Sequence, residues 1–268
     1  MLAVILARGL GSRMRRDAPD AALTGAQREA ADSGVKAMMP IGRPFLDYVL
    51  SALADGGVTD VCLVIGPEHE QVRRYYTHDV SPRRIRVVFA VQAEPRGTAD
   101  AVLSAASVAG RSPFLVLNAD NYYPVSAYRT LVEYAGPALP GFDRAALVRE
   151  GNVDAERIRH YALLRVSRDG YLEDIVEKPD VATFEQFSAN ALVSMNLWSF
   201  SDVIFEACRR IEPSARGELE LPTAVRFAVR ELGERFRVFP VASGVLDLSN
   251  RRDIAIVAER LRGVEVQL

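Results

Sequence analysis

The feature that most constrains this chain is an apolar run near its start that ends in a glycine-containing turn. The run, residues 2–7, reads Leu-Ala-Val-Ile-Leu-Ala, and residues 8–14 after it read Arg-Gly-Leu-Gly-Ser-Arg-Met. An apolar run without polar alternation is typical of a parallel strand that is covered on both faces. Two glycines separated by one residue let backbone N–H groups approach an anion closely, and Arg13 adds a positive charge beside them. These residues therefore predict a buried strand followed by a phosphate-binding turn.

Two other interpretations of this turn remain open. A turn of this kind can simply connect a strand to a helix. It can also belong to a dinucleotide-binding enzyme, but the fingerprint G-x-G-x-x-G requires a third glycine where this chain has Met14. An acidic residue is also expected at the end of the second strand, where the chain has Ile65-Gly66-Pro67. Both departures count against an NAD-dependent oxidoreductase.

Apolar runs and helical periodicity alternate along the first half of the chain. Strands are predicted at residues 61–65, 85–91 and 113–117, with a crossover helix at 44–54 and a polar helix near 68–76. This alternation requires a parallel sheet with right-handed crossovers. Beyond residue 136 the pattern changes to short strands, with a closing helix after them. We expect these strands at 145–148, 161–166, 171–176, 193–200 and 235–241, and the helix at 253–262.

Composition excludes several classes of protein. The 268 residues are 49% hydrophobic and carry a formal net charge of −2, so no overall basic field would recruit nucleic acid. No run approaches the ~18 apolar residues of a membrane span, and no basic residue precedes the first apolar run as in an export signal. Cys62 and Cys208 lie in separate apolar segments, which is typical of reduced core residues. We therefore expect a cytoplasmic protein without a nucleic-acid or membrane partner.

Residues 15–35 are rich in Ala, Asp and Arg and carry no strand pattern. One interpretation is a solvated surface excursion with a short helix around residues 25–31. The other is a mobile lid over bound phosphates, since long loops at ligand sites often gate them.

Residues 92–102, which follow the strand predicted at 85–91, read Gln-Ala-Glu-Pro-Arg-Gly-Thr-Ala-Asp-Ala-Val. Thr98 can cap a helix, and Gly97 leaves room for a flat ring to approach the backbone. The alternative is a capped turn that binds nothing.

Charged residues also follow two later strands. Asp120 comes after the strand at 113–117, at the sheet edge where ligands collect in open α/β folds. Glu177-Lys178-Pro179 ends the strand at 171–176. Each has an explanation that needs no ligand: a turn-forming aspartate in the first case and a charged strand edge in the second.

In their order along the chain, these segments resemble the sugar-nucleotide pyrophosphorylases, which are nucleotidyltransferases acting on sugar 1-phosphates. The resemblance runs from residue 1 to about residue 255, through six motifs at residues 9–14, 36–40, 92–99, 118–121, 177–179 and 216–220. The chain departs from the family pattern at Arg8 and at Ala119, where the family has glycine. The residues around Asp247, which resembles the family's second metal ligand, are also altered.

The resemblance implies an α/β fold, namely the three-layer α/β/α Rossmann-like nucleotidyltransferase fold with a mixed, mainly parallel central sheet. It implies a single domain, 1–268, in which about 1–135 bind the nucleotide and about 136–268 bind the sugar phosphate. The site residues that it implies fall into four groups. They are the catalytic residues Arg13, Lys36 and Lys178; the nucleotide-binding residues Ala7, Gly9, Gly11, Ser12, Gln92, Pro95, Gly97 and Thr98; the sugar-binding residues Glu177, Asn196 and Glu218; and the ligands of Mg²⁺, Asp120 and Asp247.

The implied reaction joins an NTP and a sugar 1-phosphate into an NDP-sugar and pyrophosphate, and the resemblance also allows a homo-oligomer. By the resemblance Gln92 binds the base, and because its amide both donates and accepts, it suits the imide edge of uracil or thymine. UTP or dTTP is therefore expected. ATP or GTP is the alternative, because Gly-Thr-Ala-Asp-Ala also occurs in adenylyl- and guanylyltransferases of the family. A non-catalytic nucleotide-sugar sensor is a further alternative, because the surroundings of Asp120 and Asp247 are altered.

Overall fold

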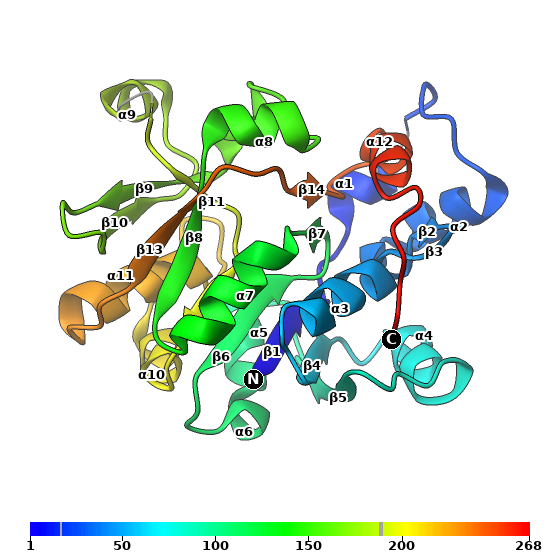
Figure 1. The fold of residues 1–268 in the computed structure, drawn as a ribbon, viewed down its shortest axis with the longest axis horizontal. Helices are drawn as coiled ribbons and strands as arrows, with labels where there is room; N and C mark the ends of the chain where they lie inside the picture. The colour runs from blue at the N-terminus through cyan, green and yellow to red at the C-terminus, as the bar shows by residue number, and fades with distance from the viewer. Residues whose placement is uncertain (17, 188–189) are drawn as a thin grey trace.

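A ten-stranded mixed sheet runs through the chain, and helices cover both of its faces (Figure 1). The computed structural model describes residues 1–16, 18–187 and 190–268. Along the sheet the strands follow the order β10 (Leu172–Val176), β9 (Ala162–Val166), β11 (Val193–Ser194), β8 (Ala138–Phe142), β12 (Trp198–Phe200), β6 (Phe114–Asn118), β1 (Leu2–Leu6), β4 (Asp60–Ile65) and β5 (Arg86–Val91), with β13 (Arg237–Val241) beside β8.

The strands β6, β1, β4 and β5 are parallel, as the first half of the sequence predicts. Residues of β1 alternate between the two faces of this sheet. Ala3 and Ile5 belong to one hydrophobic cluster, whereas Val4 belongs to the other, and all three are fully buried. The apolar run shows no polar alternation because both of its faces are covered. The three-layer arrangement expected from the sequence is confirmed.

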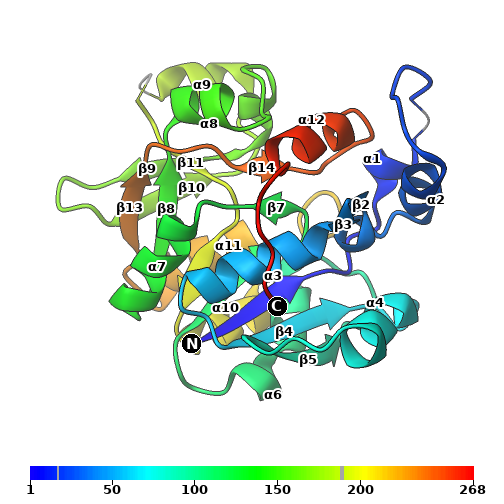
Figure 2. The same ribbon diagram turned by 45° about the vertical axis from the view of Figure 1, so that its right-hand side comes forward.

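One hydrophobic cluster packs against α3 (Phe45–Asp55), α7 (Val125–Tyr134) and α12 (Asp253–Arg260). The other packs against α5 (Thr98–Ser104), α6 (Ala106–Ala109), α10 (Val203–Arg210) and α11 (Leu221–Glu231). Figure 2 shows α3 and α7 in front of the sheet with α10 and α11 behind it. Cys62 and Cys208 are both free and buried.

The remaining elements are short. They are α1 (Ser12–Arg15), α2 (Gly25–Ser33), η1 (Lys36–Met38), β2 (Pro40–Ile41), β3 (Arg43–Pro44), α4 (Glu70–Arg74), η2 (Tyr75–Asp79), β7 (Asn121–Tyr122), α8 (Arg144–Glu150), η3 (Arg157–His160), α9 (Val181–Gln186) and β14 (Leu246–Asp247). Within the described ranges, no helix combines the length and the apolar character needed to cross a membrane.

The strand predicted at residues 145–148 is wrong, because α8 occupies these positions. Asp143 begins this helix, and its carboxylate accepts a hydrogen bond from the N–H of Ala146 at 2.7 Å. This N-cap satisfies the N–H of Ala146, which has no acceptor within the first turn of a helix. In a strand, the same N–H would need an acceptor on a neighbouring strand. The strand in this region is β8, at residues 138–142, which contains Pro140 and Gly141 and therefore lacks the usual composition of a central strand.

The strand predicted at residues 193–200 is present, but it is broken into β11 and β12. Asn196 stands at the break with a φ of 58°, a left-handed conformation that cannot continue a strand.

Residues 18–35 contain the short helix expected near residues 25–31, as α2. A capping box between Thr24 and Gln27 begins this helix. The buried guanidinium of Arg251 contacts Asp32 at 2.5 Å and also binds the carbonyl of Met14 at 2.9 Å. These contacts tie the segment to both the start and the end of the chain.

Candidate active site

The carboxyl ends of the parallel strands meet at one edge of the sheet, where the chain forms a cavity of about 770 Å³. All sixteen site residues implied by the sequence resemblance line this cavity. They come from segments as distant in sequence as the glycine turn after β1 and the strand β14. The structure therefore brings the sequence-predicted residues together, and their individual roles stay predictions.

The glycine turn leads directly into the short helix α1. Gly11 has a φ of 61°, and a Cβ there would lie 2.3 Å from the carbonyl oxygen of Gly34, so this glycine is required for the docking of residues 18–35. At Gly9, by contrast, a Cβ would meet no atom within 4 Å. Within the described ranges the exposed side chain of Arg13 makes no hydrogen bond or ion pair, so its charge is available to a ligand.

The segment after β5 differs from its sequence interpretation at Thr98. Gly97 has a φ of 122°, and a Cβ there would lie 2.4 Å from the carbonyl oxygen of Leu219, so this glycine lets the backbone of Leu219 pack closely against it. Its contact with a base stays a prediction. The side chain of Thr98 does not cap α5. Its hydroxyl instead accepts a hydrogen bond from the N–H of Leu221 at 2.9 Å, which satisfies a donor at the start of α11.

Gln92 is buried beside this segment with both amide hydrogens engaged. Its Nε2 donates to the carbonyl of Gly97 at 3.0 Å and to the carboxylate of Asp100 at 2.8 Å. Among the described residues, Oε1 of Gln92 accepts no hydrogen bond, so the side chain offers the cavity an acceptor only. The prediction that this amide both donates to and accepts from a base is therefore wrong for this conformation.

Arg8, the departure from the family glycine, also lines the cavity. Its side chain is only 8% exposed and pairs with the carboxylate of Glu68 at 3.2 Å. The guanidinium also donates to the backbone carbonyl of Gln92 at 2.5 Å. Arg8 thus joins the glycine turn to the ends of β4 and β5.

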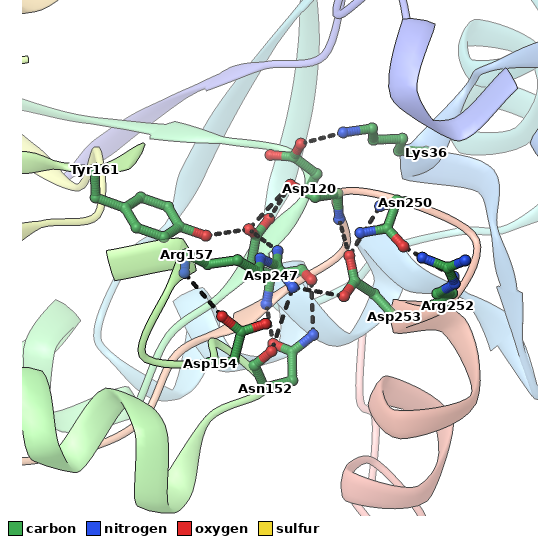
Figure 3. A network of polar contacts seen from close by, with 11 residues as sticks. Lys36, Asp120, Asn152, Asp154, Arg157, Tyr161, Asp247, Asn250, Arg252 and Asp253 are labelled. Atoms are coloured by element: carbon green, nitrogen blue, oxygen red, sulfur yellow. Dashed lines mark hydrogen bonds and ion pairs between the residues drawn. The ribbon is translucent and has the colours of Figure 1, made fainter. Parts of the chain in front are cut away.

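The two candidate metal ligands meet through the pairing of β7 with β14. Asn121 pairs with Asp247 in this ladder, and the N–H of Leu248 donates to the carbonyl of Asp120 at 2.8 Å. The amide of Asn152 clamps the backbone of Asp247 with bonds of 2.7 and 2.9 Å. Figure 3 shows both carboxylates within one polar network.

Each carboxylate of this pair also has a cationic partner. Lys36 contacts Oδ2 of Asp120 at 2.8 Å, and Arg157 contacts Oδ2 of Asp247 at 2.7 Å. The hydroxyl of Tyr161 donates to the same oxygen of Asp247. Burial, and then the charge of Asp120, raise the pKa of Asp247, whereas Tyr161 and Arg157 act in the opposite direction. The charge of Asp120 thus disfavours the ionised form of Asp247, and the two cations offset this effect.

The oxygens that remain suit a hard divalent cation. Among the described residues, Oδ1 of Asp120 accepts no hydrogen bond, and Oδ1 of Asp247 accepts only from Ser249. Mg²⁺ needs one or two carboxylate oxygens when phosphate oxygens and waters complete its octahedron. In the described part of the chain no group of three His, Cys, Asp or Glu side chains could hold a metal. The residues present therefore fit an ion that shares its coordination with a ligand's phosphates.

The other end of the cavity combines acidic residues with strained backbone. Lys178 and Asn196 have φ values of 42° and 58°, and such conformations of non-glycine residues cluster at functional sites. Burial, and then the charge of Glu220, raise the pKa of Glu177, while Lys178 lowers it. Glu220 is itself paired with Arg216 at 2.8 Å.

Sequence reasoning missed Arg157, Tyr161 and Ser249, all of which line the cavity. Tyr161 is the first residue of the strand predicted at 161–166 and directly precedes the observed β9, so its position at a strand end was a usable signal. Arg157 lies in η3, and no spacing in the sequence indicates its pairing with Asp247, 90 residues away.

The lining of the cavity carries slightly more positive than negative side chains. Six are basic and five are acidic: Arg8, Arg13, Lys36, Arg157, Lys178 and Arg216 against Asp120, Glu177, Glu218, Glu220 and Asp247. Such a balance favours an anionic ligand over a free cation.

A mixed α/β sheet with a glycine-containing turn at its carboxyl edge is typical of nucleotide-binding proteins. Residues 2–241 match the family model described as nucleotidyl transferase, and the chain belongs to this family. The membership predicted from the sequence is confirmed.

Among curated proteins, the chain is similar to the UTP–glucose-1-phosphate uridylyltransferase AglF of Haloferax volcanii. The two are 26% identical over 98% of this chain and 97% of AglF. It is also 28% identical to a glucose-1-phosphate thymidylyltransferase of Streptomyces antibioticus, over 85% of this chain. The chain spans little more than half of some relatives: 57% of that enzyme and 56% of the low-salt glycan biosynthesis nucleotidyltransferase Agl11 of Haloferax volcanii, which is 25% identical over 84% of this chain.

Solved structures support the fold. A UDP-glucose pyrophosphorylase complexed with UDP-glucose superposes with a TM-score of 0.73 over 98% of this chain and 99% of that one, at 17% identity. The predicted α/β nucleotidyltransferase fold with a mixed sheet is thereby confirmed.

Two of the glycines that line the cavity, Gly97 and Gly9, should respond differently to substitution. We expect Gly97→Ala to lower the free energy of unfolding by about 2 kcal/mol or more, because its Cβ would strike the backbone of Leu219 at a positive φ. Gly9→Ala, the matched control, should leave the stability near that of the wild type, since its Cβ meets nothing. Urea unfolding measures the free energy of unfolding of both variants. Equal stabilities would refute the close packing of Gly97 against Leu219.

Proposed function

We propose that this chain transfers a nucleotidyl group from an NTP to a sugar 1-phosphate and releases pyrophosphate. The observation that carries this proposal is that one cavity is lined by an exposed arginine after a glycine turn, a pair of adjoining carboxylates and a strained lysine beside acidic residues. The names of AglF and of the thymidylyltransferase support the same reaction.

The reaction would be an in-line attack by an oxygen of the sugar phosphate on the α-phosphorus of the NTP. Catalysis of this kind depends on positioning and on neutralising negative charge. Arg13 would hold the phosphates that leave as pyrophosphate, and Lys36 would lie nearer the bridging oxygen. Lys178 would hold the phosphate of the sugar. Mg²⁺ held by Asp120 and Asp247 would supply positive charge to the transferred phosphate.

For the base we propose uracil or thymine. The free acceptor Oε1 of Gln92 suits the N3–H of either ring. Guanine and adenine also offer N–H groups, so GTP and ATP remain the second candidates.

Pyrophosphate release from a panel of NTPs and sugar 1-phosphates tests this proposal. We expect turnover with UTP or dTTP and a hexose 1-phosphate. A sensor would bind a nucleotide without releasing pyrophosphate, and an oxidoreductase would require a nicotinamide cofactor. Turnover with GTP at least tenfold faster than with UTP and dTTP would contradict the assignment of the base.

Arg13→Lys should reduce kcat by about 10²-fold or more. A bidentate phosphate contact needs the planar guanidinium, and losing one charge-stabilising group costs rates of this order. Arg16→Lys, at an exposed position outside the cavity lining, is the control and should keep the wild-type kcat. An unchanged kcat in Arg13→Lys would place Arg13 outside the catalytic machinery.

Asp120→Asn and Asp247→Asn should each abolish Mg²⁺-dependent turnover while the fold stays intact, because each removes a charged oxygen ligand. Pyrophosphate release measures the activity, and circular dichroism measures the fold. Asp169→Asn, at the exposed hairpin between β9 and β10, should remain active. A fully active Asp247→Asn variant would remove Asp247 from the metal site.

A further inference from the structure

Both carboxylates proposed for the metal are already neutralised within the protein. Lys36 pairs with Asp120 at 2.8 Å and Arg157 pairs with Asp247 at 2.7 Å. An ammonium and a guanidinium therefore occupy the electrostatic position that a divalent cation would take. Figure 3 shows the two cations approaching the carboxylate pair from different elements, η1 and η3.

Arg157 is firmly held in this position. Its Nη1 pairs with Asp253 at 2.7 Å while its Nη2 pairs with Asp247. The second oxygen of Asp253 accepts from the N–H groups of Ser249 and Asn250 at 2.9 and 2.8 Å, so this carboxylate is saturated as well. The side chains of Asp247 and Asp253 are only 6% and 5% exposed. Removing a guanidinium from two buried carboxylates is costly, so Arg157 stays where it is when a ligand enters.

The pair of Lys36 with Asp120 is more accessible. Its side chains are 15% and 25% exposed, and among the described residues no second acceptor binds the ammonium. Arg13, which has no ion-pair partner in the part of the chain that the structure describes, lines the same cavity. In the free protein the paired carboxylates therefore attract a divalent cation little, whereas Arg13 attracts a polyanion.

We propose that Arg157 is a positioning residue that holds Asp247 as a neutral ion pair, so that the divalent cation binds only together with the nucleoside triphosphate. The incoming phosphates would draw Lys36 from Asp120, and Asp120 and Asp247 would hold the ion that arrives with them. Arg157 would meanwhile stay paired with Oδ2 of Asp247. This inference rests on the proposed function for the identity of the nucleotide.

The experiment measures protein-bound Mn²⁺ by water proton relaxation, which distinguishes an ion on the protein from an ion on free nucleotide. The wild-type protein should show relaxation enhancement only when α,β-methylene UTP is present. Arg157→Gln should bind Mn²⁺ without nucleotide at least about tenfold more tightly than the wild type, because one close charge pair has this effect or more on affinity. The double variant with Asp247→Asn should lose that gain.

Two further variants keep the test decisive. Lys36→Gln, at the more exposed pair, should also tighten binding of Mn²⁺ to the free protein. This variant provides the test if Arg157→Gln does not fold. Arg83→Gln removes an equal charge before β5, at the end of the sheet opposite the cavity, and should change nothing.

Tight binding of Mn²⁺ by the free wild-type protein would overturn the inference, and so would unchanged affinity in both site variants. These titrations need no turnover. If no substrate pair releases pyrophosphate while Arg157→Gln still tightens binding of Mn²⁺, the proposed function fails and the compensating role of Arg157 stands. If pyrophosphate is released but Arg157→Gln does not tighten binding of Mn²⁺, the role of Arg157 is rejected and the proposed function stands.

Discussion

The site depends on the backbone pairing between β7 and β14. This short ladder joins the end of the fourth parallel strand to a segment about 125 residues later and sets Asp247 opposite Asn121. The bond from Leu248 to the carbonyl of Asp120 and the amide clamp of Asn152 fix its register. Because strand register determines which residues lie opposite one another, this pairing sets Asp247 beside the residue that directly follows Asp120.

Close backbone packing explains much of what looks like ligand chemistry in the sequence. Gly11 makes room for Gly34, and Gly97 makes room for Leu219. Both glycines therefore allow segments that are distant in sequence to pack closely at the cavity wall. The hydroxyl of Thr98 acts in the same way, since it satisfies a backbone donor at the start of α11. The cavity is shaped by these contacts before any ligand enters it.

The sequence predicted β1, β4, β5 and β6 well because strands buried on both faces are long apolar runs. It failed at residues 145–148, because a four-residue apolar stretch fits a helix as well as a strand. The N-cap by Asp143 favours the helix. It also missed β8, because Pro140 and Gly141 are uncommon inside a central strand. The order of the motifs allowed the residues of one cavity to be predicted. The partners of Asp247 could not be predicted, because Arg157 and Tyr161 reach it only through tertiary packing.

The central claim is that a single cavity holds both the nucleotide and the sugar phosphate, with the carboxylate pair between them. A crystal structure of this chain with UDP-glucose and Mg²⁺ tests it most directly. The account predicts the base beside Gln92, the pyrophosphate bridge between the glycine turn and the oxygens of Asp120 and Asp247, and the sugar beside Glu177 and Lys178. A nucleotide bound outside this cavity, or a sugar on the side of Arg8 and Glu68, would contradict it.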